Sequence, residues 1–148
     1  MGFHFPFEAL YRLRQSVEHQ QELRLRAANQ QVAKVRHAIE QLTEQSHRLQ
    51  MESSEYLASG TTAAEIRFAL HSINVLALRH HELEQLLARA SSMRDQQKNL
   101  FRQARLERET LEILREQQLQ QYRRTQLRRQ QQRLDDLFLL RRSYLKRT

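Results

Sequence analysis

The stretch Ser59-Gly60-Thr61-Thr62-Ala63-Ala64-Glu65 decides the fold, because it carries the only glycine after position 2. Glycine suits the end of a helix, where the chain needs a positive φ. Thr62 and Glu65 then fit a capping box, in which the threonine hydroxyl accepts from the Glu65 N–H and the carboxylate reaches back to the cap. We therefore expect one helix to end near Leu57 and another to begin near Thr62.

Upstream of this turn, apolar residues recur at alternating steps of three and four, which is the spacing of a coiled-coil seam. The seam runs from Leu25 to Tyr56, and an earlier piece ends at Val17. Two successive four-residue steps, from Val17 through Gln21 to Leu25, form a stutter that relaxes the supercoil. Pro6 fits the first helical turn, where its missing N–H needs no partner.

Downstream of the turn, a similar seam starts at Ile66 and weakens at Arg94 and Gln97. It resumes at Phe101 and continues less regularly to Leu145. A loop this short makes consecutive helices antiparallel neighbours. We predict an all-α fold with one domain over residues 1–148: a coiled-coil hairpin with a helix at 5–58, a turn at 59–61 and a helix at 62–145. At ~1.5 Å per residue the helices are roughly 80 and 120 Å long, so the C-terminal helix overhangs the first.

The composition excludes several classes of function. There is no cysteine, and no glycine-rich phosphate loop or activated nucleophile is recognisable, so we expect no enzymatic activity and no cofactor. His80 and Glu84 share a helical face but lack the second histidine of a zinc motif, and His80 fits a polar seam position better. No apolar run reaches the ~20 residues of a membrane span. We expect a soluble, cytoplasmic protein without direct bilayer insertion.

The predicted overhang carries an unusual cluster. If residue i faces roughly residue 120 minus i, everything beyond about Gln118 has no partner in its own chain. Within that segment lie five apolar residues around two adjacent aspartates: Leu134, Asp135, Asp136, Leu137, Phe138, Leu139 and Leu140. An unpartnered apolar patch indicates an interaction site. The aspartates point about 100° apart and cannot act as a catalytic pair. Arg133 can pair with Asp136, whereas Asp135 is available to an outside partner.

The formal net charge is +8, and residues 102–148 account for +7 of it. Arginines that track phosphates would give salt-sensitive binding to nucleic acid. These arginines are scattered around the helix without aromatic platforms for bases, which favours a solvated stalk or an acidic protein partner. We therefore expect no nucleic acid partner. A basic coiled coil that binds nucleic acid is kept as a competing hypothesis. A homodimeric scaffold that buries its leucines is another. Phe3, Phe5 and Phe7 are expected to pack on the second helix.

Three stretches resemble the FliJ family of the bacterial flagellar type III export apparatus. They are the opening F-x-F-x-x-L-Y-R-L-R-x-x-x-E at Phe5–Glu18, the segment L-E-I-L-R-E-Q-Q at Leu111–Gln118, and Q-Q-R-L-D-D at Gln131–Asp136. The last is close to the family's Q-K-x-x-D-E ending, with Asp136 in place of glutamate. The chain length, the basic charge and the two long helices agree with the family over essentially the whole chain.

The resemblance implies a non-enzymatic stalk that inserts the joined ends of its helices into the hexameric export ATPase and stimulates hydrolysis. It also implies binding to the cytoplasmic domain of the export-gate membrane protein and to export chaperones, at the inner face of the cell membrane. The implied ATPase contacts are Arg128, Arg129, Leu134, Asp135, Asp136, Leu137 and Phe138. The implied export-gate contacts are Gln41, Gln45, Leu70, Asn74, Ala77 and His81. The family often has aromatic residues on the gate surface, and several of these positions lack them. The equivalent stalk of a virulence secretion system remains an alternative.

Overall fold

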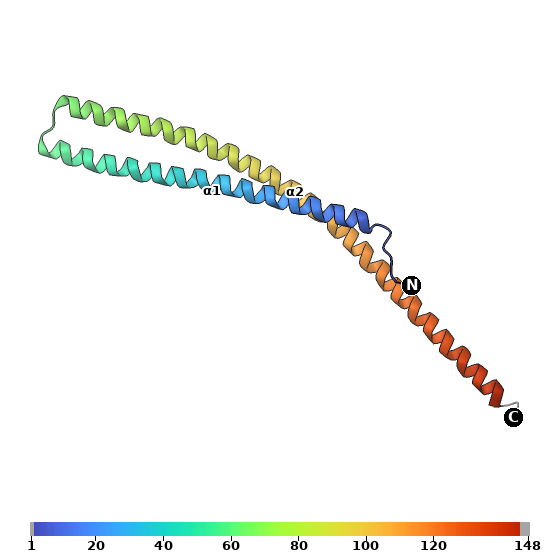
Figure 1. Ribbon diagram of the computed structural model, residues 1–148. Coiled ribbons are helices and arrows are strands. Elements are labelled where there is room, and N and C mark those ends of the chain that lie inside the picture. Colours follow the sequence, from blue (N-terminus) through green and yellow to red (C-terminus); the bar gives the residue numbers. More distant parts are fainter. Residues whose placement is uncertain (1, 146–148) are drawn as a thin grey trace. The chain divides into compact units, whose positions relative to one another are not determined.

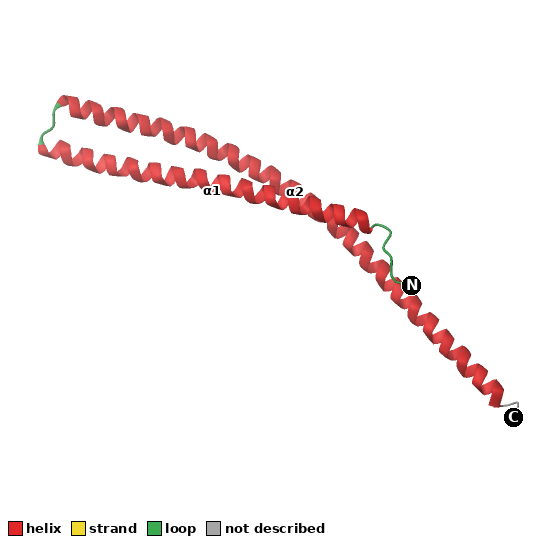
Figure 2. Cartoon of the chain, viewed as in Figure 1, coloured by secondary structure: helices red, strands yellow, loops and turns green. Residues whose placement is uncertain are grey.

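The computed structural model describes residues 2–145. These residues form two helices, α1 (Glu8–Ser59) and α2 (Ala63–Leu145), and contain no strand (Figure 1). Figure 2 shows that only the residues before α1 and the short turn between the helices are non-helical in this part of the chain. The prediction of an all-α hairpin of two long helices packed against each other is confirmed. The unpartnered overhang of the C-terminal helix stays a prediction.

The turn forms around Gly60, which has a φ of 84°. The hydroxyls of Ser59 and Thr61 donate to the Tyr56 carbonyl, over 3.1 and 3.0 Å, so this carbonyl at the end of α1 does not lack a partner. At the start of α2 the Thr62 N–H donates to the Glu65 carboxylate over 3.0 Å, as one half of a capping box requires. The Glu65 N–H donates to the Thr62 carbonyl instead of the expected hydroxyl.

The first helix begins at Glu8, three residues later than the sequence predicts. The residue before a proline is disfavoured in the helical conformation, so Phe5 stays outside the helix. Pro6 and Phe7 form a turn, and the Glu8 N–H donates to the Phe5 carbonyl over 3.2 Å. Pro6 therefore precedes the helix and does not occupy its first turn.

Packing divides the chain into two compact units, and each is described by itself. One unit is His19–Arg102, which contains the turn and the seam between α1 and α2. Its buried side chains are Val32, Val35 and Leu42, and the seam residue Ile39 between the last two is half-buried. The core is thin because each seam layer is only two helices wide.

A polar layer interrupts this seam at the predicted stutter. The Gln97 side-chain amide donates to the side-chain oxygen of Gln21 over 2.5 Å and to its carbonyl over 3.3 Å. The sequence places Gln97 where the second seam weakens and Gln21 at the stutter, and the two meet. A partly buried amide pair at one layer favours a single register, because a slip would leave both amides without partners.

The other unit combines the segment up to Glu18 with the segment from Gln103 onward. Phe5 and Tyr11 are its buried aromatic residues, and Phe3 packs on Tyr122 with ring centroids 5.7 Å apart. The Arg115 guanidinium lies over the Tyr11 ring, 5.5 Å from its centroid. Phe3 therefore packs on α2 as the sequence predicts, whereas Phe7 is 45% exposed and lies edge-on against Phe5, with ring centroids 5.8 Å apart.

Ion pairs between α1 and α2 fix the register of the same unit. Arg14 donates to Glu107 over 2.5 Å, and Arg108 donates to Glu18 and also to Glu112. The Arg108 and Glu18 side chains are only 17% and 18% exposed. Burial lowers the pKa of Arg108, but its hydrogen bonds and the charges of the two glutamates outweigh burial, so the pKa is raised.

Candidate functional site

Two adjacent histidines of α2, His80 and His81, contact polar side chains one turn away. The His80 imidazole lies 3.5 Å from the Glu84 carboxylate, and the His81 ring lies 3.1 Å from the Gln85 amide. Residues 2–145 contain no group of three or more metal-ligating side chains close enough to hold an ion. Over the same residues no helix combines the length and the apolar character needed to cross a membrane.

The apolar cluster near the end of α2 is exposed to solvent. We name it the C-terminal patch and define it as Leu134, Leu137, Phe138, Leu139 and Leu140. Its exposed fractions run from 57% for Leu140 to 67% for Phe138.

The C-terminal patch surrounds the helix. Leu134, Leu137 and Phe138 share one face at steps of three and four, and Leu139 and Leu140 continue around the axis at 100° per residue. A helix that is apolar on one face packs on one neighbour, whereas a helix that is apolar all round is normally buried on all sides. The geometry of the patch therefore fits a partner that encloses the helix.

The charged residues around the C-terminal patch have no ion-pair partners among residues 2–145. Asp135 and Asp136 are exposed, and neither forms an ion pair there. The pair expected as possible between Arg133 and Asp136 is not formed. Arg128 and Arg129 are likewise exposed and unpaired within the described chain. These groups keep their hydrogen-bonding capacity for another molecule.

Four of the six residues expected to bind the export gate form one stripe on α2. All four are exposed, and their steps of four, three and four keep them on one face: Leu70, Asn74, Ala77 and His81. Each follows a seam residue by one position, so the stripe is rotated about 100° from the seam. We name this set the gate stripe.

The other two residues expected to bind the gate, Gln41 and Gln45, are exposed on α1. Each precedes a seam residue by one position. In an antiparallel pair of right-handed helices, residues that follow the seam lie on one side of the pair and residues that precede it lie on the other. The structure therefore separates these glutamines from the gate stripe.

The gate stripe meets α1 at a groove of about 260 Å³. Ala77 of the stripe and Gln50 of α1 both line it, together with Leu42 at its base. Gln50 follows Leu49 by one position, so it lies on the same side of the pair as the stripe. No motif in the sequence singles out Gln50.

A larger apolar groove, of about 620 Å³, lies at the turn end of the hairpin. Tyr56 and Leu57 of α1 and Phe68 and Leu70 of α2 contribute to it, with exposed fractions of 57% or more. The spacing of apolar residues predicts a seam position for Tyr56 and no role for Phe68. A signal was present, because four large apolar side chains beside a turn exceed what a two-helix seam can cover.

A model described as "Flagellar FliJ protein" matches residues 3–147 of the chain, which is nearly its whole length. A search of curated proteins found no match, and a search of solved structures found none either. The family match covers both helices, the turn, the gate stripe and the C-terminal patch. The chain therefore belongs to the FliJ family of flagellar proteins.

Proposed function

We propose that this protein is the stalk of a flagellar type III export apparatus, and that it stimulates the hexameric export ATPase without being an enzyme. Membership of the FliJ family supports a role in flagellar export. The same match favours the flagellar apparatus over a virulence secretion system. In this role the protein is cytoplasmic and is held at the inner face of the cell membrane by its partners.

The observation that carries the proposal is the C-terminal patch, whose apolar side chains surround the helix and are 57% to 67% exposed. A ring of ATPase subunits can enclose a single helix and cover all of these side chains together. A flat partner would cover about half of them. The exposed leucines and Phe138 therefore favour insertion into a central opening over docking on a surface.

The charged residues beside the C-terminal patch would orient the helix within the ATPase ring. Asp135 and Asp136 point about 100° apart, so they address different subunits of an enclosing ring. Arg128 and Arg129 lie about one and a half turns toward the N-terminus and would meet acidic groups at the rim of the opening. An asymmetric rod in a near-symmetric ring stabilises different conformations in different subunits, which is how it would accelerate hydrolysis.

The turn end of the hairpin supplies the second contact. We assign the gate stripe, with the part of the adjoining groove at Leu70, to the cytoplasmic domain of the export-gate protein. Exposed apolar grooves with few charges suit a partner that is released and rebound. Gln41 and Gln45 lie on the other side of the helix pair, and they contribute only where this partner wraps around it. Export chaperones are further partners, implied by the family.

The test is the hydrolysis rate of the export ATPase from the same organism, titrated with this protein at moderate ionic strength. Saturable stimulation is expected. It should be lost on truncation after Gln126, which removes the C-terminal patch, and strongly reduced by Asp135→Lys combined with Asp136→Lys. Helical content, measured by circular dichroism, should stay at the wild-type level in the double variant.

The matched control is Glu55→Lys combined with Glu116→Lys, which adds the same positive charge at exposed positions away from the patch. This control should stimulate like the wild type. Equal stimulation by the wild type and the aspartate double variant would refute the role of the aspartates. Absence of stimulation by a correctly helical wild-type protein, with an assembled ATPase hexamer, would refute the stalk function.

A further inference from the structure

A second stripe runs along α2 on the flank that precedes the seam. Its residues recur at alternating steps of four and three, like the seam, but each stands one position earlier: Phe68, Ser72, Val75, Arg79, Glu82, Leu86, Arg89, Met93, Gln96 and Leu100. Its apolar members are 47% to 72% exposed. We name it the lateral stripe. A coiled-coil spacing on an exposed flank indicates a surface suited to another helix.

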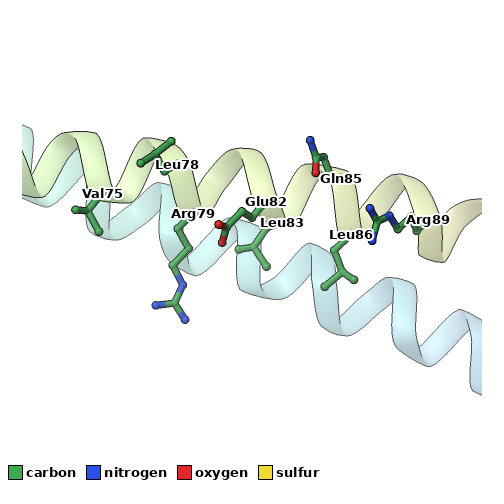
Figure 3. Close-up of a pocket in the computed structure, with 8 residues that line it drawn as sticks. All are labelled: Val75, Leu78, Arg79, Glu82, Leu83, Gln85, Leu86 and Arg89. Carbon is green, nitrogen blue, oxygen red and sulfur yellow. The ribbon is translucent and has the colours of Figure 1, made fainter.

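The middle of the lateral stripe forms a shallow groove of about 720 Å³ on α2 (Figure 3). Val75 and Leu86 are among its lining residues, and Arg79, Glu82 and Arg89 place charges between and beside them. In Figure 3 Arg79 extends away from the helix, on the side opposite Leu78 and Gln85. None of the three charged residues forms an ion pair within residues 2–145.

We propose that the lateral stripe pairs with the same stripe of a second copy of this chain, in antiparallel orientation. A two-fold axis between positions 80 and 81 brings Arg79 opposite the partner's Glu82, and by symmetry brings Glu82 opposite the partner's Arg79. The same register sets Val75 against the partner's Leu86 and Phe68 against the partner's Met93. Two ion pairs at the centre are thus flanked on each side by apolar layers.

Other registers lack this complementarity. Antiparallel helices pair their stripe positions in steps of seven residues, so the alternatives are few. A shift of one heptad in one direction sets Arg79 against the partner's Arg89. A shift in the other sets Arg79 against the partner's Val75. A parallel, in-register pair would oppose Arg79 to its own copy and Glu82 to its own copy. The charges of the stripe therefore favour one orientation and one register.

The pairing leaves the gate stripe accessible. The gate stripe follows the seam by one residue and the lateral stripe precedes it by one, so the two are about 200° apart around α2. A dimer through the lateral stripe would present two gate stripes outward. This inference does not depend on the proposed function, because it rests on residues 68 to 100 alone.

The test is the mass of the full chain in solution, measured by sedimentation over a dilution series. We expect a concentration-dependent rise from 17.9 kDa toward twice that mass. Arg79→Glu alone places two glutamates at each central pair, and Glu82→Arg alone places two arginines there. Each single variant should weaken association by about tenfold or more, because like charges face each other twice.

Complementation makes the test specific. An equimolar mixture of the Arg79→Glu and Glu82→Arg chains restores opposite charges in the mixed pair and should associate like the wild type. The double variant Arg79→Glu with Glu82→Arg should also recover self-association. Arg67→Glu is the matched control, since this exposed arginine lies on the opposite flank of α2 and its reversal should change nothing.

Because the chain contains no cysteine, a second readout is available. Chains carrying Arg79→Cys and chains carrying Glu82→Cys should form a disulfide when mixed and oxidised. A constant mass of 17.9 kDa up to on the order of 100 μM, with wild-type helicity, would overturn the proposal and leave the stripe to the helix of a different protein. Association that the single charge reversals leave unchanged would also overturn it.

Discussion

Replacing Glu18 by glutamine will destabilise the N-terminal part of the hairpin more than loss of any exposed ion pair. Glu18 accepts from Arg108, and both side chains are less than one fifth exposed. Arg108 also donates to Glu112. The Glu109 carboxylate lies 3.7 Å from the Arg108 guanidinium as a third acidic neighbour. Removal of the Glu18 charge therefore leaves a partly desolvated guanidinium with one carboxylate partner fewer.

The magnitude follows from burial. A hydrogen bond to a charged group contributes roughly 1.5–3 kcal/mol when water is largely excluded, and the residual exposure of this pair places it near the lower end. We expect a coupling of about 1.5 kcal/mol between Glu18 and Arg108. For comparison, Arg48 and Glu44 form an exposed pair one turn apart, with side chains 70% and 64% exposed. Such pairs contribute about 0.3–0.5 kcal/mol.

The raised pKa of Arg108 determines how its contribution to stability changes with pH. The pKa of Arg108 is raised in the folded protein. A raised pKa contributes stability that is fully present below the ordinary arginine pKa and is lost only as the pH rises through the higher folded-state value. Arg108 therefore adds no pH dependence to unfolding measured between about pH 6 and 9.

The assay is a double-mutant cycle of Glu18→Gln and Arg108→Met, followed by urea unfolding with circular dichroism. Methionine keeps most of the apolar stem of arginine and removes its charge. A second cycle, Arg48→Met with Glu44→Gln, is the matched exposed control. The reasoning is refuted if the coupling between Glu18 and Arg108 is no larger than the coupling in the control cycle.

Three further predictions concern the fold. Gly60→Ala should cost about 1–2 kcal/mol in thermal unfolding, because the φ of 84° is strained for alanine although no atom lies near the added methyl; a cost near zero would contradict this reading of the turn. Replacing Gln21 and Gln97 together by leucine should raise the midpoint of urea unfolding, since an apolar layer replaces a polar one; a lower midpoint would show that the amide pair is needed for more than register. Leu42→Ala should cost about 2–3 kcal/mol, and Leu139→Ala less than about 0.5 kcal/mol, because only Leu42 is buried; similar costs in unfolding would contradict the assigned burial.

The turn could be predicted from the sequence because its signals are local. Gly60 supplies the positive φ and Glu65 caps α2, and both effects act within a few residues. The start of α1 also depends on a local signal, but here two local effects of Pro6 oppose each other, and the sequence predicts a start three residues too early. Pro6 is compatible with a first helical turn, but its restriction on Phe5 has the stronger effect.

The contacts of the N-terminal unit could not be predicted residue by residue. The spacing of apolar residues gives the face of each helix, but charged side chains reach across that face according to their length and rotamer. The sequence alone therefore did not pair Glu18 with Arg108. The C-terminal patch was identifiable because five large apolar residues stand together in a segment rich in arginine and glutamine.

Apolar periodicity does not reveal the lateral stripe, because Arg79, Glu82 and Arg89 occupy its central positions. Once Ile73 and Leu76 are placed on the seam, the remaining spacing of α2 becomes visible. The seam, the gate stripe and the lateral stripe are the same four-three pattern offset by one residue. Two packed helices have almost no interior, so each offset of 100° opens a separate surface. One long helix therefore offers separate faces to α1, to the proposed gate partner and to the proposed second copy along the same thirty residues.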